Sequence, residues 1–285
     1  MSIQNIITPE PKDLGGFTIQ RILPAPGWRS VGPFVFLDHF GPTTLDPKEG
    51  IQVRPHPHIG LATLTYLYEG EIIHRDSLGI TQAIEKGAVN LMTAGKGIVH
   101  SERTRKNQEK GIDMHGLQCW IALPQDKEEI EPAFEHYPDN KIPKTTIDGV
   151  TIDIVMGSAY GQHSPVTSYS PSLYLSMLLH PGSSILLPQN YSEIAVYVIS
   201  GSVVFEDTEI AQHNMVVLEA ENENHIATNE ESQVLVLGGD NLGERHLWWN
   251  FVSSDKERLE QAKQNWKNGL FEKVPGETEF IPLPE

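Results

Sequence analysis

The chain has 285 residues, which is long for one compact core and comfortable for two. Its composition, 39% hydrophobic and 21% charged, is that of an ordinary globular protein, and no apolar stretch approaches the roughly 20 residues that span a bilayer. The formal net charge of −17 would repel nucleic-acid phosphates. We therefore expect neither a membrane protein nor a direct nucleic-acid binder.

The first residues, MSIQNIITPEP, contain no basic segment followed by a long apolar run, so the sequence shows no export signal. Cys119 is the one cysteine and cannot form an internal disulfide, which agrees with a reducing compartment. It stands in the apolar run LQCWIAL, where a buried structural thiol is more common than a reactive one. We expect a cytoplasmic protein.

Residues 17–123 alternate short β-rich runs with turn residues and show little helical periodicity. This pattern predicts an antiparallel all-β domain over residues 1–130. Its turns or bulges are expected at four glycines, Gly70, Gly79, Gly87 and Gly95.

A polar, proline-containing stretch then leads to a second series of β-rich runs, which ends near residue 239. Residues 63–92 and 193–220 share one pattern: a strand, a glycine turn, a strand, a short turn and a strand. The identity between them is weak, but the pattern favours two related β-barrels, the second over residues 131–250.

Residues 251–285 are predicted to form a C-terminal helix and tail. Ser254 and Glu257 have the spacing of a capping box, and Gly269 is placed to end the helix. Apolar residues recur between them at helical spacing: Leu259, Ala262 and Trp266. We expect this amphipathic helix to pack on its own barrel, with a partner-binding helix as the alternative.

Two short motifs carry the chemistry. In HPHIG, His56 and His58 are two residues apart, so in a strand both imidazoles project from one face. His100 and Glu102 repeat this spacing in GIVHSE. Two neighbouring strands could therefore direct four ligands at one metal ion. One such pair would be weak evidence, because most histidines only form hydrogen bonds or face solvent.

A purely structural role for the four side chains has a physical objection. Inside a barrel without a metal they would bury polar groups, at several kcal/mol unless each found a partner. The objection disappears if they face solvent, but the apolar flanks LATLTY and NLMTAG favour a barrel wall. Three imidazoles and a carboxylate suit Fe(II), and also Ni, Co, Mn or Cu, with coordination positions left open.

The segments PHPHIGLATLTYLYEGEIIHRDSLG, TAGKGIVHSE and HGLQCWIALP closely resemble the pirin family, a branch of the cupin superfamily. The resemblance implies a bicupin fold of two facing antiparallel β-barrels. It also implies one metal ion, usually iron, in the N-terminal barrel, with its ligands at His56, His58, His100 and Glu102. Some members that resemble this chain are quercetin 2,3-dioxygenases, and others regulate partner proteins.

The leading hypothesis from this resemblance is a dioxygenase that opens the heterocycle of a flavonol with O2 and releases carbon monoxide. Glu102 would then be a ligand and also the base that takes the substrate proton. His115 and His74 are candidates for orienting a ligand or substrate, although for each a strand-end histidine with one local hydrogen bond is the alternative. A regulator whose metal redox state changes a protein-binding surface is the competing class, and a metal-dependent hydrolase or isomerase is a third.

The chain departs from the family pattern at two positions. Ala62 stands where cupins place a glutamate after the second histidine, and Ile59 stands where pirins often have a basic residue. We expect both to make the surroundings of the site more apolar. In the second barrel, Leu187 and Gln189 stand at the first two ligand positions and His225 is a lone histidine, so we expect no metal there.

Overall fold

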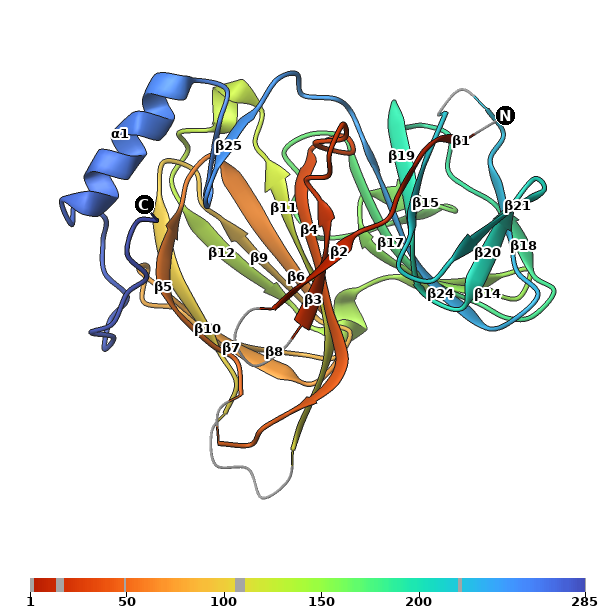
Figure 1. Cartoon of the computed structure of the whole chain (residues 1–285), viewed down its shortest axis with the longest axis horizontal. Coiled ribbons are helices and arrows are strands. Elements are labelled where there is room, and N and C mark those ends of the chain that lie inside the picture. Colours follow the sequence, from red (N-terminus) through yellow and green to blue (C-terminus); the bar gives the residue numbers. More distant parts are fainter. Residues whose placement is uncertain (1–2, 14–17, 49, 106–110, 220–221, 285) are drawn as a thin grey trace. The chain divides into compact units, whose positions relative to one another are not determined.

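The computed structural model describes residues 3–13, 18–48, 50–105, 111–219 and 222–284 (Figure 1). Its contacts divide the chain into two compact units. We call one the histidine unit, made of Asp13–Ile19, His39–Asp139 and Leu242–Glu285. The other, the apolar unit, is made of Met1–Lys12, Gln20–Asp38 and Asn140–Asn241. The domain boundaries expected near residues 130 and 250 stay a prediction.

Two antiparallel sheets contain most of the strands of the histidine unit. The smaller sheet has the order β5 (Gln52–His58), β10 (Ile98–Arg103), β7 (Glu71–Asp76) and β8 (Thr81–Glu85). The larger has the order β12 (Ala133–Tyr137), β9 (Val89–Thr93), β6 (Leu61–Glu69), β11 (Ile112–Ala122), β4 (Phe34–Leu45), β3 (Thr18–Leu23) and β2 (Glu10–Asp13). Strands β2, β3 and β4 contain residues of both units.

The apolar unit is also built from one large and one small sheet. The large sheet has the order β1 (Ile3–Ile7), β22 (Met215–Leu218), β19 (Glu193–Ser200), β24 (Ser232–Gly239), β17 (Ser172–Leu179), β14 (Val150–Met156) and β13 (Lys144–Ile147). The small sheet has the order β18 (Ser184–Leu186), β23 (His225–Ala227), β20 (Ser202–Phe205) and β21 (Thr208–Ala211). Aliphatic and aromatic side chains of both sheets form one buried core.

The remaining described elements are short, apart from one helix. They are the paired strands β15 (Ser158–Ala159) and β16 (Gln162–His163), the pair β25 (His246–Trp248) and β26 (Phe251–Ser253), two 3-10 turns η1 (Gln125–Lys127) and η2 (Asp139–Lys141), and the helix α1 (Lys256–Lys267). No helix among the described residues is long and apolar enough to cross a membrane.

The internal repeat predicted from the sequence is confirmed at the level of strands. Residues 63–92 lie in β6, β7, β8 and β9, and residues 193–220 reach β19, β20, β21 and β22. In both, the outer strands pair with each other and the inner two form a hairpin. Each segment contains four strands where three were expected, because Gly87 in one and an Asn214 turn in the other interrupt the last β-rich run. All four predicted turn glycines have positive φ angles.

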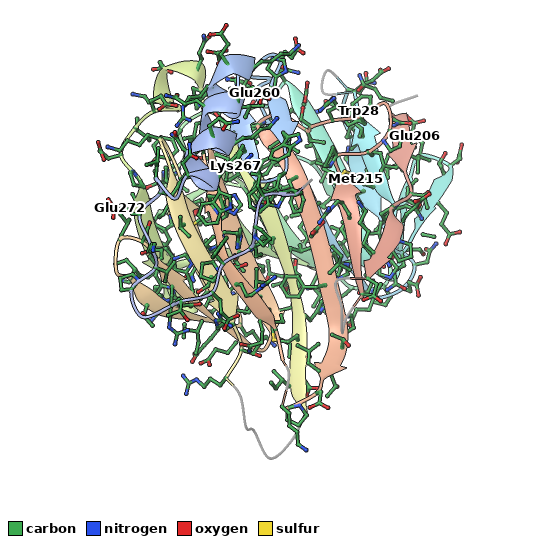
Figure 2. The ribbon with its side chains drawn as sticks, turned by 60° about the vertical axis from the view of Figure 1, so that its left-hand side comes forward. Trp28, Glu206, Met215, Glu260, Lys267 and Glu272 are labelled. Carbon is green, nitrogen blue, oxygen red and sulfur yellow. The ribbon has the colours of Figure 1, made fainter. Side chains whose placement is uncertain are left out.

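The predicted C-terminal helix is present, but its N-terminal cap is not Ser254. Asp255 takes this position, and its carboxylate accepts a hydrogen bond of 2.9 Å from the Glu257 backbone N–H. Ser254 instead donates through its backbone N–H and hydroxyl to the buried carboxylate of Glu128. Leu259 and Ala262 are buried, as predicted, whereas Glu260 and Lys267 are exposed on the helix (Figure 2). The helix therefore packs on the barrel.

Candidate metal centre

Strands β5 and β10 place three histidines side by side. His56 and His58 alternate along β5, so both project from the same face, and His56 lies directly opposite His100 in the antiparallel register of β10. Strand β5 is an edge strand of its sheet. This position tolerates Pro55 and Pro57, which lack an N–H for a neighbouring strand and place their rings on the face away from the histidines.

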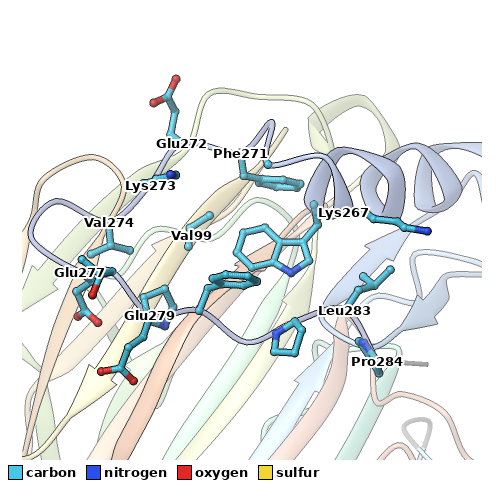
Figure 3. Close-up of a pocket in the computed structure, with 16 residues that line it drawn as sticks. Val99, Lys267, Phe271, Glu272, Lys273, Val274, Glu277, Glu279, Leu283 and Pro284 are labelled. Carbon is cyan, nitrogen blue, oxygen red and sulfur yellow. The ribbon is translucent and has the colours of Figure 1, made fainter.

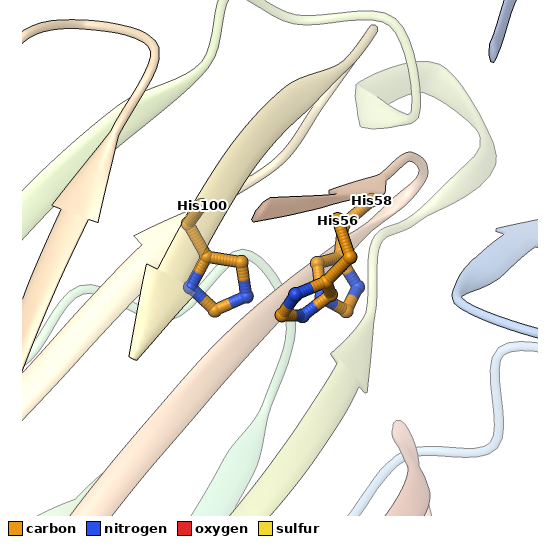
Figure 4. Close-up of side chains that lie close together, drawn as sticks. All are labelled: His56, His58 and His100. Atoms are coloured by element: carbon orange, nitrogen blue, oxygen red, sulfur yellow. The ribbon is translucent and has the colours of Figure 1, made fainter. Parts of the chain in front are cut away.

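The three imidazoles converge (Figure 4). One ring nitrogen from each of His56, His58 and His100 lies within 4.8 Å of the others. The ring centroids are 4.4 Å apart for His56 and His100, and 5.0 Å apart for His58 and each of its two neighbours. All three side chains are buried. Three nitrogens at these separations suit a single metal ion.

Burial decides the charge of the three histidines. It lowers the pKa of His56 to about 4, although a hydrogen bond to the Arg54 carbonyl oxygen opposes the shift. Burial, together with the neighbouring histidines, lowers the pKa of His58 and of His100 well below the usual value. The imidazoles are therefore neutral at pH 7, and each has one ring nitrogen with a free lone pair.

The hydrogen bonds show which nitrogens are available. Nδ1 of His56 lies 2.9 Å from the Arg54 carbonyl oxygen and donates to it, which leaves the Nε2 lone pair free. Within the described part of the chain, Nε2 of His100 and both ring nitrogens of His58 are buried with no hydrogen-bond partner of acceptable geometry. The Asn250 backbone raises the pKa of His58, but burial and the neighbouring His56 lower it by more. Unsatisfied buried nitrogens of this kind are costly in a protein without a ligand, so the donor set fits a metal ion.

Glu102, the fourth predicted ligand, does not belong to this convergent group. Its two carboxylate oxygens accept hydrogen bonds of 2.8 and 3.1 Å from the Gln118 side-chain amide on β11. Burial raises the pKa of Glu102, while Gln118 and the nearby His74 lower it. Glu102 is two residues beyond His100 on β10 and lies directly across from His74 on β7. Its carboxylate is therefore near His74. Its role as a ligand stays a prediction.

His115, the candidate orienting residue, lies in a different contact. Its Nε2 is 3.0 Å from Nε2 of His39 on β4, and its ring centroid lies 4.9 Å from that of Tyr68. The hydrogen bonds and ring contacts seen for His115 involve none of the three converging histidines. A role for His115 at the metal centre stays a prediction.

Three residues around the site, Trp120, Gln118 and Asp76, were not singled out in the sequence, whereas His74 was one of the candidate orienting residues. Trp120 packs edge-on against His58 at 5.2 Å, and Gln118 holds Glu102. Asp76 lies 2.9 Å from His74, whose ring in turn contacts His100. The sequence signal that could have found Asp76 is HRD, because His74 and Asp76 repeat the spacing of two residues seen in both ligand motifs.

The two departures from the family pattern lie among apolar contacts. Ala62 is buried on β6, between β9 and β11. Ile59 is 1% exposed and belongs to an apolar cluster with Phe251, Leu259 and Ala262. Ile59 therefore supports α1, which the sequence alone did not indicate.

A cavity of about 810 Å3 lies on the opposite face of the ligand-bearing strands (Figure 3). Pro55 and Val99 line it, and these residues alternate with His56 and His100. Trp266 of α1 and the tail after it, including Phe271 and Phe280, form the rest of its wall. This cavity is separated from the histidines by the strands themselves.

In the apolar unit the corresponding strands carry different side chains. Strands β18 and β23 occupy the places that β5 and β10 take in the histidine unit. Ile185 and Ile226 point from them into the apolar core, and Leu187 is buried beyond them. His225 is exposed. The interior of this unit is therefore filled by hydrocarbon.

Comparison with known proteins agrees with this architecture. Residues 16–121 match the Pirin family, and residues 174–272 match the Pirin C-terminal cupin domain. A pirin-like protein of Caulobacter vibrioides is 46% identical over 279 residues, which cover 96% of each chain. A Pseudomonas aeruginosa protein, provisionally named a quercetin 2,3-dioxygenase, is 37% identical over 258 residues, covering 90% of this chain and 80% of the relative.

The fold is similarly close to a solved structure. Quercetin 2,3-dioxygenase from Acinetobacter baumannii superposes with a TM-score of 0.91 at 35% identity, covering 99% of this chain and 95% of the other. The predicted fold, two cupin-type β domains with one C-terminal helix, is thereby confirmed. With family matches in both halves and a relative that is 46% identical over nearly the whole length, the chain belongs to the pirin family.

Proposed function

We propose that this protein is a metal-dependent dioxygenase that acts on a flavonol or a similar enol, opening its heterocycle with release of carbon monoxide. One observation carries the proposal: three buried, neutral imidazoles converge within 4.8 Å. The quercetin 2,3-dioxygenase named among its relatives and the one among the similar structures support the choice of reaction. Fe(II) suits the donor set, as do Ni, Co, Mn and Cu.

His56, His58 and His100 would hold the metal, with Glu102 as a fourth ligand. The metal would supply Lewis acidity and the redox chemistry that activates O2. The buried surroundings, with Trp120 packed against His58, exclude water and strengthen electrostatic interactions with a bound substrate.

Glu102 is the group best placed to take the hydroxyl proton of an enol. Burial raises its pKa, so its carboxylate is a stronger base than an exposed glutamate, and Gln118 fixes its orientation by donating to both oxygens. In this role the carboxylate accepts the proton as the substrate binds and returns it when the ring-opened product leaves.

The Glu102→Gln variant tests this role. We expect flavonol turnover to fall by 10²–10⁴-fold, the usual contribution of a general base. Metal content should fall far less, because the three histidines remain. Turnover is followed as loss of flavonol absorbance with and without O2, and metal content by elemental analysis, with the exposed Asp113→Asn as control. Equal loss of metal and turnover would make Glu102 a ligand only.

The same assay separates the competing functions. A protein that binds metal but consumes no O2 with any flavonol would contradict the dioxygenase and leave the redox-sensitive regulator. Turnover of substrate under strictly anaerobic conditions would instead indicate a metal-dependent hydrolase or isomerase. The pirin family relationship and the metal centre would be unaffected by either result.

A further inference from the structure

Asp76, at the end of β7, is fully buried and has a fixed set of hydrogen bonds. Its Oδ1 accepts from the backbone N–H groups of Leu78 and Ile80, at 2.9 and 3.0 Å. Its Oδ2 lies 2.9 Å from Nε2 of His74. Two backbone donors hold the carboxylate in place by hydrogen bonds to Oδ1, so Oδ2 is left as an acceptor directed at His74.

The acceptor determines where His74 carries its proton. A neutral imidazole has one N–H, and the Asp76 carboxylate draws it to Nε2. Nδ1 of His74 is then an acceptor. It lies 3.3 Å from Nδ1 of His100, within hydrogen-bonding distance. The ring of His74 stacks on Phe134 with centroids 4.4 Å apart and planes inclined by 19°, which fixes the direction of this lone pair.

The hydrogen bond to His74 in turn determines the tautomer of His100. Its Nδ1 must donate to His74, so Nδ1 carries the proton and Nε2 keeps the lone pair. Nε2 is the His100 nitrogen that is buried without a partner among the described residues. His56 is the same tautomer, because its Nδ1 donates directly to the Arg54 carbonyl oxygen. Both rings thus keep their free lone pair on Nε2.

We propose that Asp76 and His74 form a relay that fixes the tautomer and orientation of His100 for metal binding. They are positioning residues, because neither belongs to the convergent group of His56, His58 and His100. The inference rests on the metal centre in the proposed function and not on the choice of substrate. Groups that orient a ligating histidine typically change metal affinity by about 10–100-fold when they are lost.

The first test uses the unaltered full-length protein. Two-bond ¹H–¹⁵N correlation spectra of histidine side chains distinguish the Nδ1–H from the Nε2–H tautomer, and the His100→Gln variant assigns the signal. We expect metal-free His100 to be the Nδ1–H tautomer. A predominant Nε2–H tautomer would overturn the proposal, because the relay would then run in the opposite direction.

The second test reverses the relay with an isosteric change. In Asp76→Asn the amide oxygen can still accept from Leu78 and Ile80, so its NH2 group faces Nε2 of His74. The proton of His74 then moves to Nδ1, and the proton of His100 moves to Nε2, where it blocks the metal-binding lone pair. We expect the tautomer signal to invert and Co(II) affinity, measured by competition titration, to fall 10–100-fold.

Two comparisons make the second test decisive. Asp113→Asn, an exposed change of the same chemistry on β11, should leave Co(II) affinity and the tautomer unchanged. Wild-type Co(II) affinity in Asp76→Asn would overturn the relay. If Asp76→Asn fails to fold, the spectrum of the wild-type protein still decides. Absence of flavonol turnover by the unaltered protein would contradict only the proposed function, because neither the tautomer spectrum nor the Co(II) titration uses a substrate.

Discussion

At the scale of single residues, burial determines which groups in the histidine unit can react. The same desolvation that keeps His56, His58 and His100 neutral makes their lone pairs available to a metal at neutral pH. An exposed histidine would compete with protons in this range. A metal centre built from such groups needs little proton release on binding.

Cys119 shows the opposite consequence of burial. Its side chain is fully buried on β11, and burial raises the pKa of the thiol far above its usual value, so the reactive thiolate is suppressed. We expect no reaction of the folded protein with Ellman's reagent over hours. One thiol per chain should react in guanidinium, which serves as the control. Fast labelling of the native protein would contradict a buried thiol.

At the scale of elements, α1 is held by a small apolar cluster. Leu259 is 5% exposed and packs with Ile59, Phe251 and Ala262. Leu259→Ala should lower the free energy of unfolding of the metal-free protein by about 2–4 kcal/mol, because it removes buried methyl groups and leaves a cavity. Urea denaturation measures this loss. The exposed Gln261→Ala is the matched control, and an equal effect of both variants would show that α1 is not packed as described.

The C-terminal tail is tied to β10 by an ion pair. The Glu277 carboxylate accepts from the Arg103 guanidinium and the Ser101 hydroxyl. Burial raises the pKa of Glu277, but these hydrogen bonds and the charges of Arg103 and Arg75 outweigh it and leave the pKa below its usual value of 4.5. The tail therefore depends on the ionised carboxylate.

The sign of this shift gives a pH dependence. A depressed pKa contributes stability above the unfolded-state value, and this stability is lost as pH falls through the folded-state pKa. At pH 7 the free energy of unfolding of the wild type should exceed that of Glu277→Gln by on the order of 1 kcal/mol. This difference should begin to shrink as the pH falls below the unfolded-state value and should disappear below the folded-state pKa. Denaturation curves at several pH values measure it. A difference that grows on acidification would contradict the ion pair.

The sequence predicted most elements because local chemistry determines them. Alternating apolar residues predicted the β strands, and HPH and HSE predicted histidines on one face of neighbouring strands. The cap of α1 was assigned one residue too early, because Glu128, distant in the sequence, takes the hydrogen bonds of Ser254. The contact between His115 and His39 joins residues 76 positions apart and had no local signature.

At the scale of the whole molecule, one sheet plan serves two purposes. Both units combine a large sheet with a four-stranded sheet of the same strand order. In the apolar unit, Ile185 and Ile226 fill the interior, whereas in the histidine unit the corresponding strands present imidazoles. The chemistry therefore depends on a few side chains and not on the fold.

The central claim is that His56, His58 and His100 together bind one metal ion. Equilibrium dialysis of the full-length protein against Co(II), followed by elemental analysis, tests it directly. The claim predicts one tightly bound ion per chain in the wild type, its loss in His56→Ala, His58→Ala and His100→Ala, and its retention in the exposed His225→Ala. Undiminished binding in the three variants, or no binding in the wild type, would contradict it.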